Sequence, residues 1–179
     1  MKSRSGFTIV ELLIVIVVIA ILAAISVVAY NGIQERTENT KTIQAVSQYA
    51  KIIMSYAATY GNYPIDTGNP CLSESGTYCA RVSGTTNCFG GGATGSNVNY
   101  IAELKKIVTT LPQASSQRIP CNGAEYTGVH TVASTGSTSD VYYFLKGNQA
   151  CEGIGGAVSY MKQQQEGLTR CRASLPTLP

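Results

Sequence analysis

Charged residues are scarce in this chain, and histidine occurs once. Asp, Glu, Lys and Arg make up 13% of the 179 residues, and the formal net charge is +3. Without Lys2 and Arg4 at the N-terminus, 11 basic and 10 acidic residues remain, a balance that indicates no acidic partner. The one histidine, His130, lies between Val129 and Thr131 in a strand-like run, so we expect a structural role for it. The acidic residues are dispersed and form no Asp-rich calcium loop. The sequence therefore predicts no enzymatic activity, no cofactor and no metal site.

Proline and glycine are absent from residues 7–31, and the first proline is Pro64. Within this stretch the eighteen residues from Leu12 to Ala29 carry no charge, enough for a helix of about 27 Å. Lys2 and Arg4 precede the run and would keep the N-terminus on the cytoplasmic side. We therefore expect a straight membrane-spanning helix whose only weak point is Asn31-Gly32, with the bulk of the chain outside the cytoplasm.

Two simpler interpretations of the apolar run remain open. A secretory signal peptide has an apolar region of about 7–15 residues followed by a small-residue cleavage site, and the run here is longer. A plain signal anchor accommodates the length but gives no reason for Glu11 at the front edge of the run. A carboxylate costs about 2.5–3.5 kcal/mol to insert at a helix centre and less near the end, so an acid at this place suggests a function.

The residues around Glu11 carry a resemblance to a known family. The segment Gly6-Phe7-Thr8-Ile9-Val10-Glu11-Leu12-Leu13, after a short basic leader, resembles the N-terminal signature of type IV pilins and of the pseudopilins of type II secretion. In that family a membrane peptidase cuts after the glycine and methylates the new N-terminal phenylalanine. The resemblance covers about residues 1–60. It implies cleavage between Gly6 and Phe7, N-methylation of Phe7, and Glu11 as the fifth residue of the mature chain.

Glu11 is the only acid in the apolar segment, and it lies one helical turn from the future Phe7 amine. An unpaired charge leaving water costs several kcal/mol, so we predict that the Phe7 amine of an incoming subunit pairs with Glu11 of a neighbour in the filament. The alternative is that Glu11 only favours its own helix N-terminus, which is worth about 0.3–1 kcal/mol.

Helical periodicity resumes beyond Gly32, through apolar residues spaced by three or four: Ile43, Val46, Ala50, Ile53, Ala57 and Tyr60. The segment Gly61 to Pro64 would end the helix. The predicted organisation is a removed leader at residues 1–6, a transmembrane and filament-core helix at 7–30, an amphipathic continuation at 31–60, and a globular head at 61–179.

All six cysteines follow the helix, on the side expected to be oxidising, and their even number and spacing favour disulfides over a zinc site. Fifteen pairings are compatible with six cysteines. We favour Cys151 with Cys171, because Cys171 lies in a C-terminal strand-like run and a bridge there would anchor the tail. The pairing within the other four stays open: Cys71, Cys79, Cys88 and Cys121. The first three of these lie in residues 65–97, a Gly-rich stretch that predicts a flexible loop.

The head also carries one helical and three strand-like patterns. The spacing of Ile101, Leu104, Val108 and Leu111 predicts a second short helix stopped by Pro112. Strands are predicted over 125–132, 140–146 and 168–173, and the second of these is apolar on both faces, as expected of a central strand. The predicted fold class is α+β and type IV pilin-like, with a long N-terminal helix, apolar in its first half, and a small C-terminal antiparallel sheet as the head.

These features favour a structural subunit of a bacterial surface filament that serves adhesion, twitching motility or DNA uptake. Expected partners are the prepilin peptidase, an inner-membrane platform with its assembly ATPase, and further copies of this chain or other pilins. The precursor would lie in the cytoplasmic membrane and the assembled subunit on the cell surface. One alternative is a type II secretion pseudopilin. Another is a DNA-binding competence pilin, for which the sheet would have to gather four basic residues into one patch: Arg118, Lys162, Arg170 and Arg172.

Overall fold

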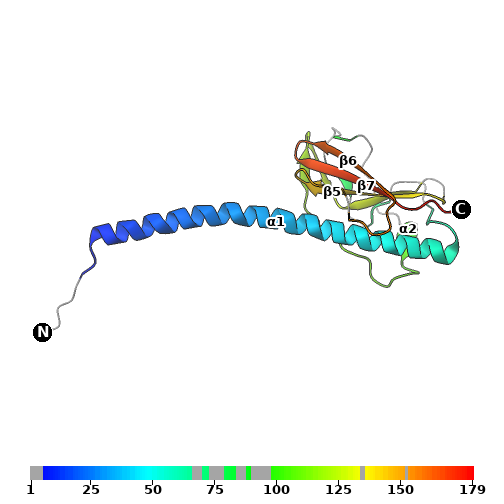
Figure 1. The fold of residues 1–179 in the computed structure, drawn as a ribbon, viewed down its shortest axis with the longest axis horizontal. Coiled ribbons are helices and arrows are strands. Elements are labelled where there is room, and N and C mark those ends of the chain that lie inside the picture. The colour runs from blue at the N-terminus through cyan, green and yellow to red at the C-terminus, as the bar shows by residue number, and fades with distance from the viewer. Residues whose placement is uncertain are drawn as a thin grey trace. The chain divides into compact units, whose positions relative to one another are not determined.

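The computed structural model describes residues 6–65, 70–72, 79–83, 88–89, 98–133, 136–151 and 153–179. In this part of the chain lie helices α1 (Ile9–Tyr60) and α2 (Val98–Leu104) and seven strands (Figure 1). The residues form two compact units, Met1–Thr37 and Glu38–Pro179, so that α1 contributes to both. Helix α1 passes through Asn31 and Gly32 without a break, and no proline lies in this part of the helix to interrupt its backbone hydrogen bonds.

The first unit is the N-terminal part of α1, and its apolar side chains remain exposed. The Ile, Val and Leu side chains from Ile9 to Val27 are between 47% and 83% exposed. Branched residues such as these are mediocre helix formers in water, whereas in lipid a lone segment must satisfy its backbone hydrogen bonds internally and becomes helical. The described part of the first unit therefore leaves this apolar surface uncovered, as is typical of a helix that is covered by lipid or by other chains.

The second unit contains a four-stranded antiparallel sheet in the order β4-β5-β7-β6 (Figure 1). The strands are β4 (Val129–Ala133), β5 (Ser139–Lys146), β7 (Leu168–Ser174) and β6 (Ser159–Gln165). Strand β5 pairs with β4 on one side and with β7 on the other, so the apolar run predicted to be central is central. Strand β6 pairs with β7 in unbroken register from Ser159 to Gln165 and forms one edge.

A second, three-stranded sheet has the order β1-β3-β2, with β1 (Ala80–Ser83), β3 (Ala124–Thr127) and β2 (Ile119–Cys121). A two-residue turn with positive φ at Asn122 and Gly123 joins β2 to β3, which suits the twist of an antiparallel hairpin. Tyr126 of this sheet contacts Phe144 of β5, with ring centroids 5.2 Å apart. The two sheets thereby share a small apolar cluster.

The main core of the second unit lies between the C-terminal part of α1 and one face of the four-stranded sheet. Helical spacing places Val46, Tyr49 and Ile53 on one side of α1, where all three are fully buried. Alternate residues of β5 fill the other side of this core, because side chains at i and i+2 share a sheet face: Val141, Tyr143 and Leu145. The amphipathic continuation predicted for this part of the helix is therefore the wall on which the sheet packs.

Several local predictions were wrong. The strand predicted over 125–132 is two strands in different sheets, since the chain bends at Gly128, whose φ of +73° favours glycine. An added Cβ there would lie 3.1 Å from Cβ of Cys79, which makes the approach close as well. The second helix ends at Leu104 rather than near Leu111. Ile107 N–H donates to the Leu104 carbonyl at 3.0 Å, and this three-residue spacing replaces the α-helical one.

The sequence did not predict β1, β2 or β6. Strand β6 is exposed over nearly its whole length, so its sequence has no alternation of apolar and polar residues. Of residues 65–97, which were predicted to form a flexible loop, the structure describes 65, 70–72, 79–83 and 88–89, and β1 lies among them. Gly90–Gly92 lie outside the described residues.

Candidate processing and assembly site

The chain enters α1 through a reciprocal set of hydrogen bonds between Thr8 and Glu11. The Thr8 N–H donates to Glu11 Oε2 at 2.7 Å, and the Thr8 hydroxyl donates to the same oxygen at 2.8 Å. In return the Glu11 N–H donates to Thr8 Oγ1 at 3.2 Å. Thr8 is thus the N-cap residue and Glu11 the third residue of the helix, the arrangement known as a capping box. It satisfies backbone donors that the first helical turn would otherwise leave unpaired.

The capping box assigns Glu11 the local role that the sequence left open, and it adds Thr8, which sequence reasoning missed. The signal was present, because Thr8-Ile9-Val10-Glu11 has the spacing of a capping box ahead of an apolar run. Both hydrogen bonds from Thr8 reach Glu11 Oε2. The local role therefore leaves Glu11 Oε1 for a second donor.

Gly6 and Phe7 precede the helix, and their backbone is not helical. Phe7 is 80% exposed, and a Cβ added at Gly6 would meet no atom within 4 Å. The predicted scissile bond between these residues is therefore outside regular secondary structure and accessible. Residues 1–5 of the predicted leader lie outside the described residues.

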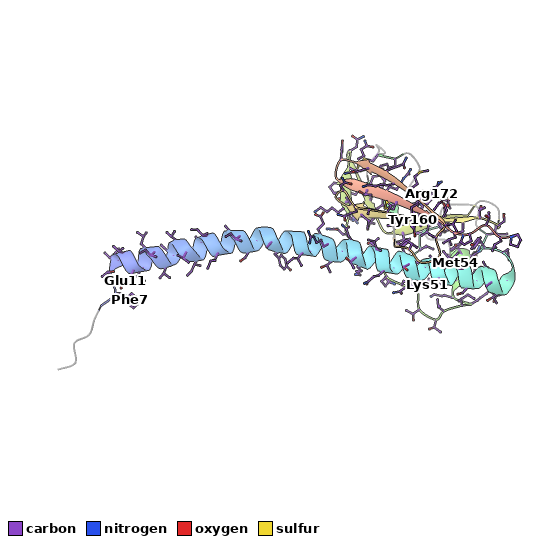
Figure 2. All side chains as sticks on the ribbon, in the orientation of Figure 1. Phe7, Glu11, Lys51, Met54, Tyr160 and Arg172 are labelled. Atoms are coloured by element: carbon purple, nitrogen blue, oxygen red, sulfur yellow. A yellow bond between two sulfur atoms is a disulfide. The ribbon has the colours of Figure 1, made fainter. Side chains whose placement is uncertain are left out.

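Directly behind this motif, α1 is long and apolar enough to cross a membrane. Its most apolar window of 18 residues has a mean hydropathy of 3.4, and none of that window is buried. Figure 2 shows Phe7 and Glu11 at the start of this surface. The arrangement is a processing motif joined directly to an apolar, unburied helix.

In the second unit all six cysteines form disulfides. Cys151 is joined to Cys171, the pair that the sequence favoured, and the bond ties β7 to the loop before β6. The remaining four, whose pairing the sequence left open, are joined as Cys71–Cys79 and Cys88–Cys121. Cys121, Cys88 and Glu166 offer atoms within 4.8 Å of one another, a metal-like grouping, but both sulfurs are in a disulfide and have no thiolate to donate.

His130 is buried in β4, and its ring stacks on Tyr142 at 5.0 Å between centroids. Burial of the ring, and then the charge of Arg170, lower the pKa of His130 to about 4. The imidazole is therefore neutral near pH 7 and packed among aromatic rings, as the expected structural role requires.

The four basic residues that a DNA-binding patch would need lie in different places and have different partners. Arg118 pairs with Glu125 at 3.1 Å, and Arg172 lies 3.7 Å from Asp140. Arg170 is half-buried and donates to the Phe89 carbonyl at 3.2 Å.

Lys162 stands opposite Cys171, so it occupies the sheet face opposite to that of the neighbouring β7 residues Arg170 and Arg172. The sheet therefore gathers no common patch from these four side chains.

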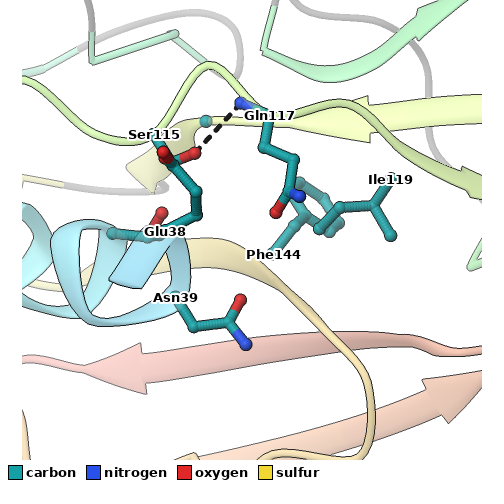
Figure 3. A pocket seen from close by; sticks show the side chains of 8 residues that line it. Glu38, Asn39, Ser115, Gln117, Ile119 and Phe144 are labelled. Carbon is teal, nitrogen blue, oxygen red and sulfur yellow. Dashed lines mark hydrogen bonds between the residues drawn. The ribbon is translucent and has the colours of Figure 1, made fainter. Parts of the chain in front are cut away.

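A shallow depression of the second unit lies beside the α1 residues Glu38 and Asn39 (Figure 3). Ser115, Gln117, Ile119 and Phe144 line its other sides. The Gln117 backbone N–H donates to the Ser115 hydroxyl at 3.0 Å (dashed in Figure 3), so this hydroxyl stabilises the local backbone. Asn39 likewise exchanges hydrogen bonds of 2.9 Å with the Lys146 backbone. These contacts account for Ser115 and Asn39 in the lining without a ligand.

Comparison with known protein families gives one match. The model of the prokaryotic N-terminal methylation motif matches residues 1–27, which is the prepilin motif of type IV pilins and pseudopilins. Comparison with curated proteins and with solved structures gave no match. The long N-terminal helix followed by antiparallel sheets is an α+β, pilin-like fold. Residues 1–27 thus carry the motif of a type IV pilin-like or pseudopilin precursor, and this motif implies a substrate of the prepilin peptidase that assembles into a filament.

Proposed function

We propose that this chain is the structural subunit of a type IV pilin-like bacterial surface filament, made as a membrane-inserted precursor and polymerised through the first part of α1. The observation that carries the proposal is the apolar window of α1, none of which is buried, directly behind the processing motif. Such a surface requires lipid before assembly and other subunits after it. The role is structural rather than catalytic.

Assembly of such a subunit needs a source of work. Lipid tails and a bundle of apolar helices are comparably apolar, so hydrophobic burial alone does not move α1 from the membrane into a filament. An inner-membrane platform driven by an assembly ATPase would supply that work, lifting one subunit at a time. The filament then consists of a core of α1 segments, with the disulfide-bonded units outside.

Glu11 would set the axial register of each incoming subunit. Cleavage after Gly6 creates a charged amine on Phe7, at the edge of an apolar environment. Glu11 of a neighbouring subunit can neutralise this amine through Oε1, while Oε2 keeps its hydrogen bonds of 2.7 and 2.8 Å to Thr8. Two opposite charges leaving water stabilise each other only when they meet, so the pair favours one axial position.

The test replaces Glu11 by glutamine. Glutamine also serves as the third helical residue of a capping box, so Glu11→Gln removes the charge and keeps the local hydrogen bonds. We expect normal cleavage after Gly6 and nearly complete loss of filaments in cells that make only the variant. Cleavage is measured by intact mass, and filament yield by immunoblotting of material sheared from the cells.

Two further variants separate charge from capping. Glu35→Gln makes the same chemical change on the same helix outside the apolar run, and we expect it to leave the yield unchanged. Thr8→Val removes the capping hydroxyl but keeps the carboxylate, and we expect a smaller loss than for Glu11→Gln. Normal filament yield with Glu11→Gln would contradict the proposed role of Glu11 in assembly.

The cellular site of the filament decides between the proposal and its relatives. Labelled filaments on the cell surface and in the sheared fraction support a pilin. A product confined to the periplasm would identify a secretion pseudopilin instead. Retention on DNA that falls steeply with salt would identify an uptake pilin.

A further inference from the structure

His130 occupies an unusual position in the head, because it is polar, buried and incompletely paired. The residue pairs with Tyr142 across the β4–β5 ladder and is 7% exposed. Since Val141 and Tyr143 face the core formed with α1, Tyr142 and His130 lie on the opposite face of the sheet. The imidazole stacks within 5.0 Å of the Tyr142 ring and 5.8 Å of the Phe144 ring, between centroids. Among the described residues, Nδ1 of His130 is buried and has no hydrogen-bond partner.

The segment 70–72 is fastened to β4 directly beside His130. The Leu72 N–H donates to the Val129 carbonyl at 2.9 Å, and the Thr131 N–H donates to the Pro70 carbonyl at 3.1 Å. Between these hydrogen bonds, Cys71 stands opposite His130 in an antiparallel bridge. Residues opposite each other in such a bridge project to the same face, so the Cys71 sulfur and the imidazole are neighbours.

The disulfide of Cys71 links this position to the second sheet. Cys71 is joined to Cys79, the residue immediately before β1, and both cysteines are buried. Cys79 packs against Gly128, the bend between β3 and β4. His130 therefore lies at the joint where the three-stranded sheet and segment 70–72 meet the four-stranded sheet.

We propose that His130 is an acid-operated latch: uptake of one proton by its imidazole releases segment 70–72 and the Cys71–Cys79 disulfide from β4. A charged imidazole loses its hydration when it is enclosed by aromatic rings, and the Nδ1–H that it gains finds no acceptor among the described residues. Opening of the joint returns the charged ring to water. Segment 70–72 is attached to β4 through the two backbone hydrogen bonds that flank His130, and to α1 through the Tyr49 hydroxyl, which donates to the Leu72 carbonyl at 3.0 Å. Strand β5, by contrast, pairs with β4 over five residues, so segment 70–72 is the part that yields.

The charged and titratable groups on this face oppose protonation. Arg170 of β7 lies over the Tyr142 ring, with Cζ 5.7 Å from the centroid, and adds a positive charge near the imidazole. The Asp140 carboxylate is engaged by Arg172 at 3.7 Å. The titratable and charged groups of the packed elements are Tyr126 of β3, Asp140 and Tyr142 of β5, and Arg170 and Arg172 of β7.

The direction of the pH dependence follows from these groups. Burial, and then Arg170, lower the pKa of His130 from its ordinary value of 6.5 to about 4. Between these values the open joint binds a proton that the closed joint does not, so acid favours opening. Above pH 6.5 both forms are neutral at this residue and the latch stays closed. A drop from pH 7 to pH 5 raises the open fraction about 20-fold if His130 regains its ordinary pKa in the open form.

The test measures the rate at which a phosphine reductant opens each disulfide of the full chain in detergent micelles. Alkylation and peptide mapping at timed intervals give the three rates separately. Cys151–Cys171 is the internal control, because Cys171 lies on the sheet face turned toward α1 and is fully buried. We expect Cys71–Cys79 to be reduced about 20-fold faster at pH 5 than at pH 7, relative to this control.

Two variants isolate the histidine. His130→Phe keeps an aromatic ring in the stack, and His130→Gln keeps a polar side chain, and neither can be protonated. We expect the relative rate for Cys71–Cys79 to become independent of pH in both. The latch is refuted if the unmodified chain shows the same relative rate at both pH values, or if acid accelerates all three disulfides equally, which indicates global unfolding. Acceleration that persists in His130→Phe or His130→Gln would also overturn it.

Discussion

The two units of this chain contain similar apolar residues but bury them to very different extents. Leu22, in the first unit, is 59% exposed, whereas Leu145, in the second unit, is fully buried. The second unit satisfies its apolar residues internally, against the C-terminal part of α1, and adds three disulfides. The described residues of the first unit, 6–37, contribute no such core, and the apolar window of α1 is unburied. Apolar residues therefore build a core in the second unit and an exposed surface in the first, which the proposed function assigns to lipid and other subunits.

This difference predicts which property a substitution alters in each unit. Changes in the second unit alter the free energy of unfolding of the head. Changes in the first unit leave that free energy unchanged and alter membrane insertion or assembly. The predictions below either sharpen this comparison or break it.

The largest expected contrast comes from the same substitution in both units. Leu145→Ala removes a fully buried side chain from the core and should lower the free energy of unfolding of the head by about 2–5 kcal/mol. Leu22→Ala should change it by less than about 0.5 kcal/mol, because Leu22 has no core around it. Denaturant unfolding of the full chain in detergent, followed by tyrosine circular dichroism, measures both. Equal losses for the two variants would break the comparison.

The disulfide between Cys151 and Cys171 should contribute nearly as much. It closes a loop with a sequence separation of 20, and the chain-entropy treatment assigns about 3 kcal/mol to a loop of this length. We expect the double variant Cys151→Ala/Cys171→Ala to lower the free energy of unfolding of the head by that amount. The helix signal of the apolar part of α1 in micelles should remain. A loss of that helix signal would show that the two units do not behave independently.

A smaller effect is expected where α1 meets α2. The Tyr56 hydroxyl donates to Glu103 Oε2 at 2.5 Å, and Lys106 holds the same carboxylate at 2.7 Å. The Glu103 carboxylate is partly exposed to water, which weakens this hydrogen bond, so Tyr56→Phe should lower the free energy of unfolding by less than the core substitution. Tyr60→Phe is the matched control on the same helix, since Tyr60 is 46% exposed. Denaturant unfolding measures both variants. An equal loss of the free energy of unfolding for Tyr56→Phe and Tyr60→Phe would show that the hydrogen bond from Tyr56 to Glu103 adds no stability.

The parts of the fold that the sequence predicted are those with a strong one-dimensional pattern. The helix that the sequence predicted to end at Tyr60 ends there in the structure, because Gly61, with a φ of +76°, interrupts it. Strand β5 follows from an apolar run, and β7 from a strand-like run in which buried residues alternate with half-buried ones from Thr169 onward. The parts that it missed depend on contacts distant in sequence. Strand β6 owes its place to pairing with β7, and the split at Gly128 depends on Cys79 lying against it.

The candidate site divides in the same way. Gly6, Phe7 and Glu11 lie within one short motif, so the sequence alone predicts them. Thr8 lies in the same motif and was overlooked, although its spacing to Glu11 predicts the capping box that the structure contains. The pairings Cys71–Cys79 and Cys88–Cys121 could not be derived from spacing, because they depend on how the two sheets pack.

The most direct test of the central claim is the chemical identity of the N-terminus. The account predicts that the filament subunit begins at N-methyl-Phe7, having lost residues 1–6 and gained one methyl group. Intact-mass measurement of purified filaments, followed by fragmentation of the N-terminal peptide, reads both changes at once. A subunit that retains Met1, or one that is cut near Ala29, would contradict the assignment of this chain as a processed pilin-like precursor.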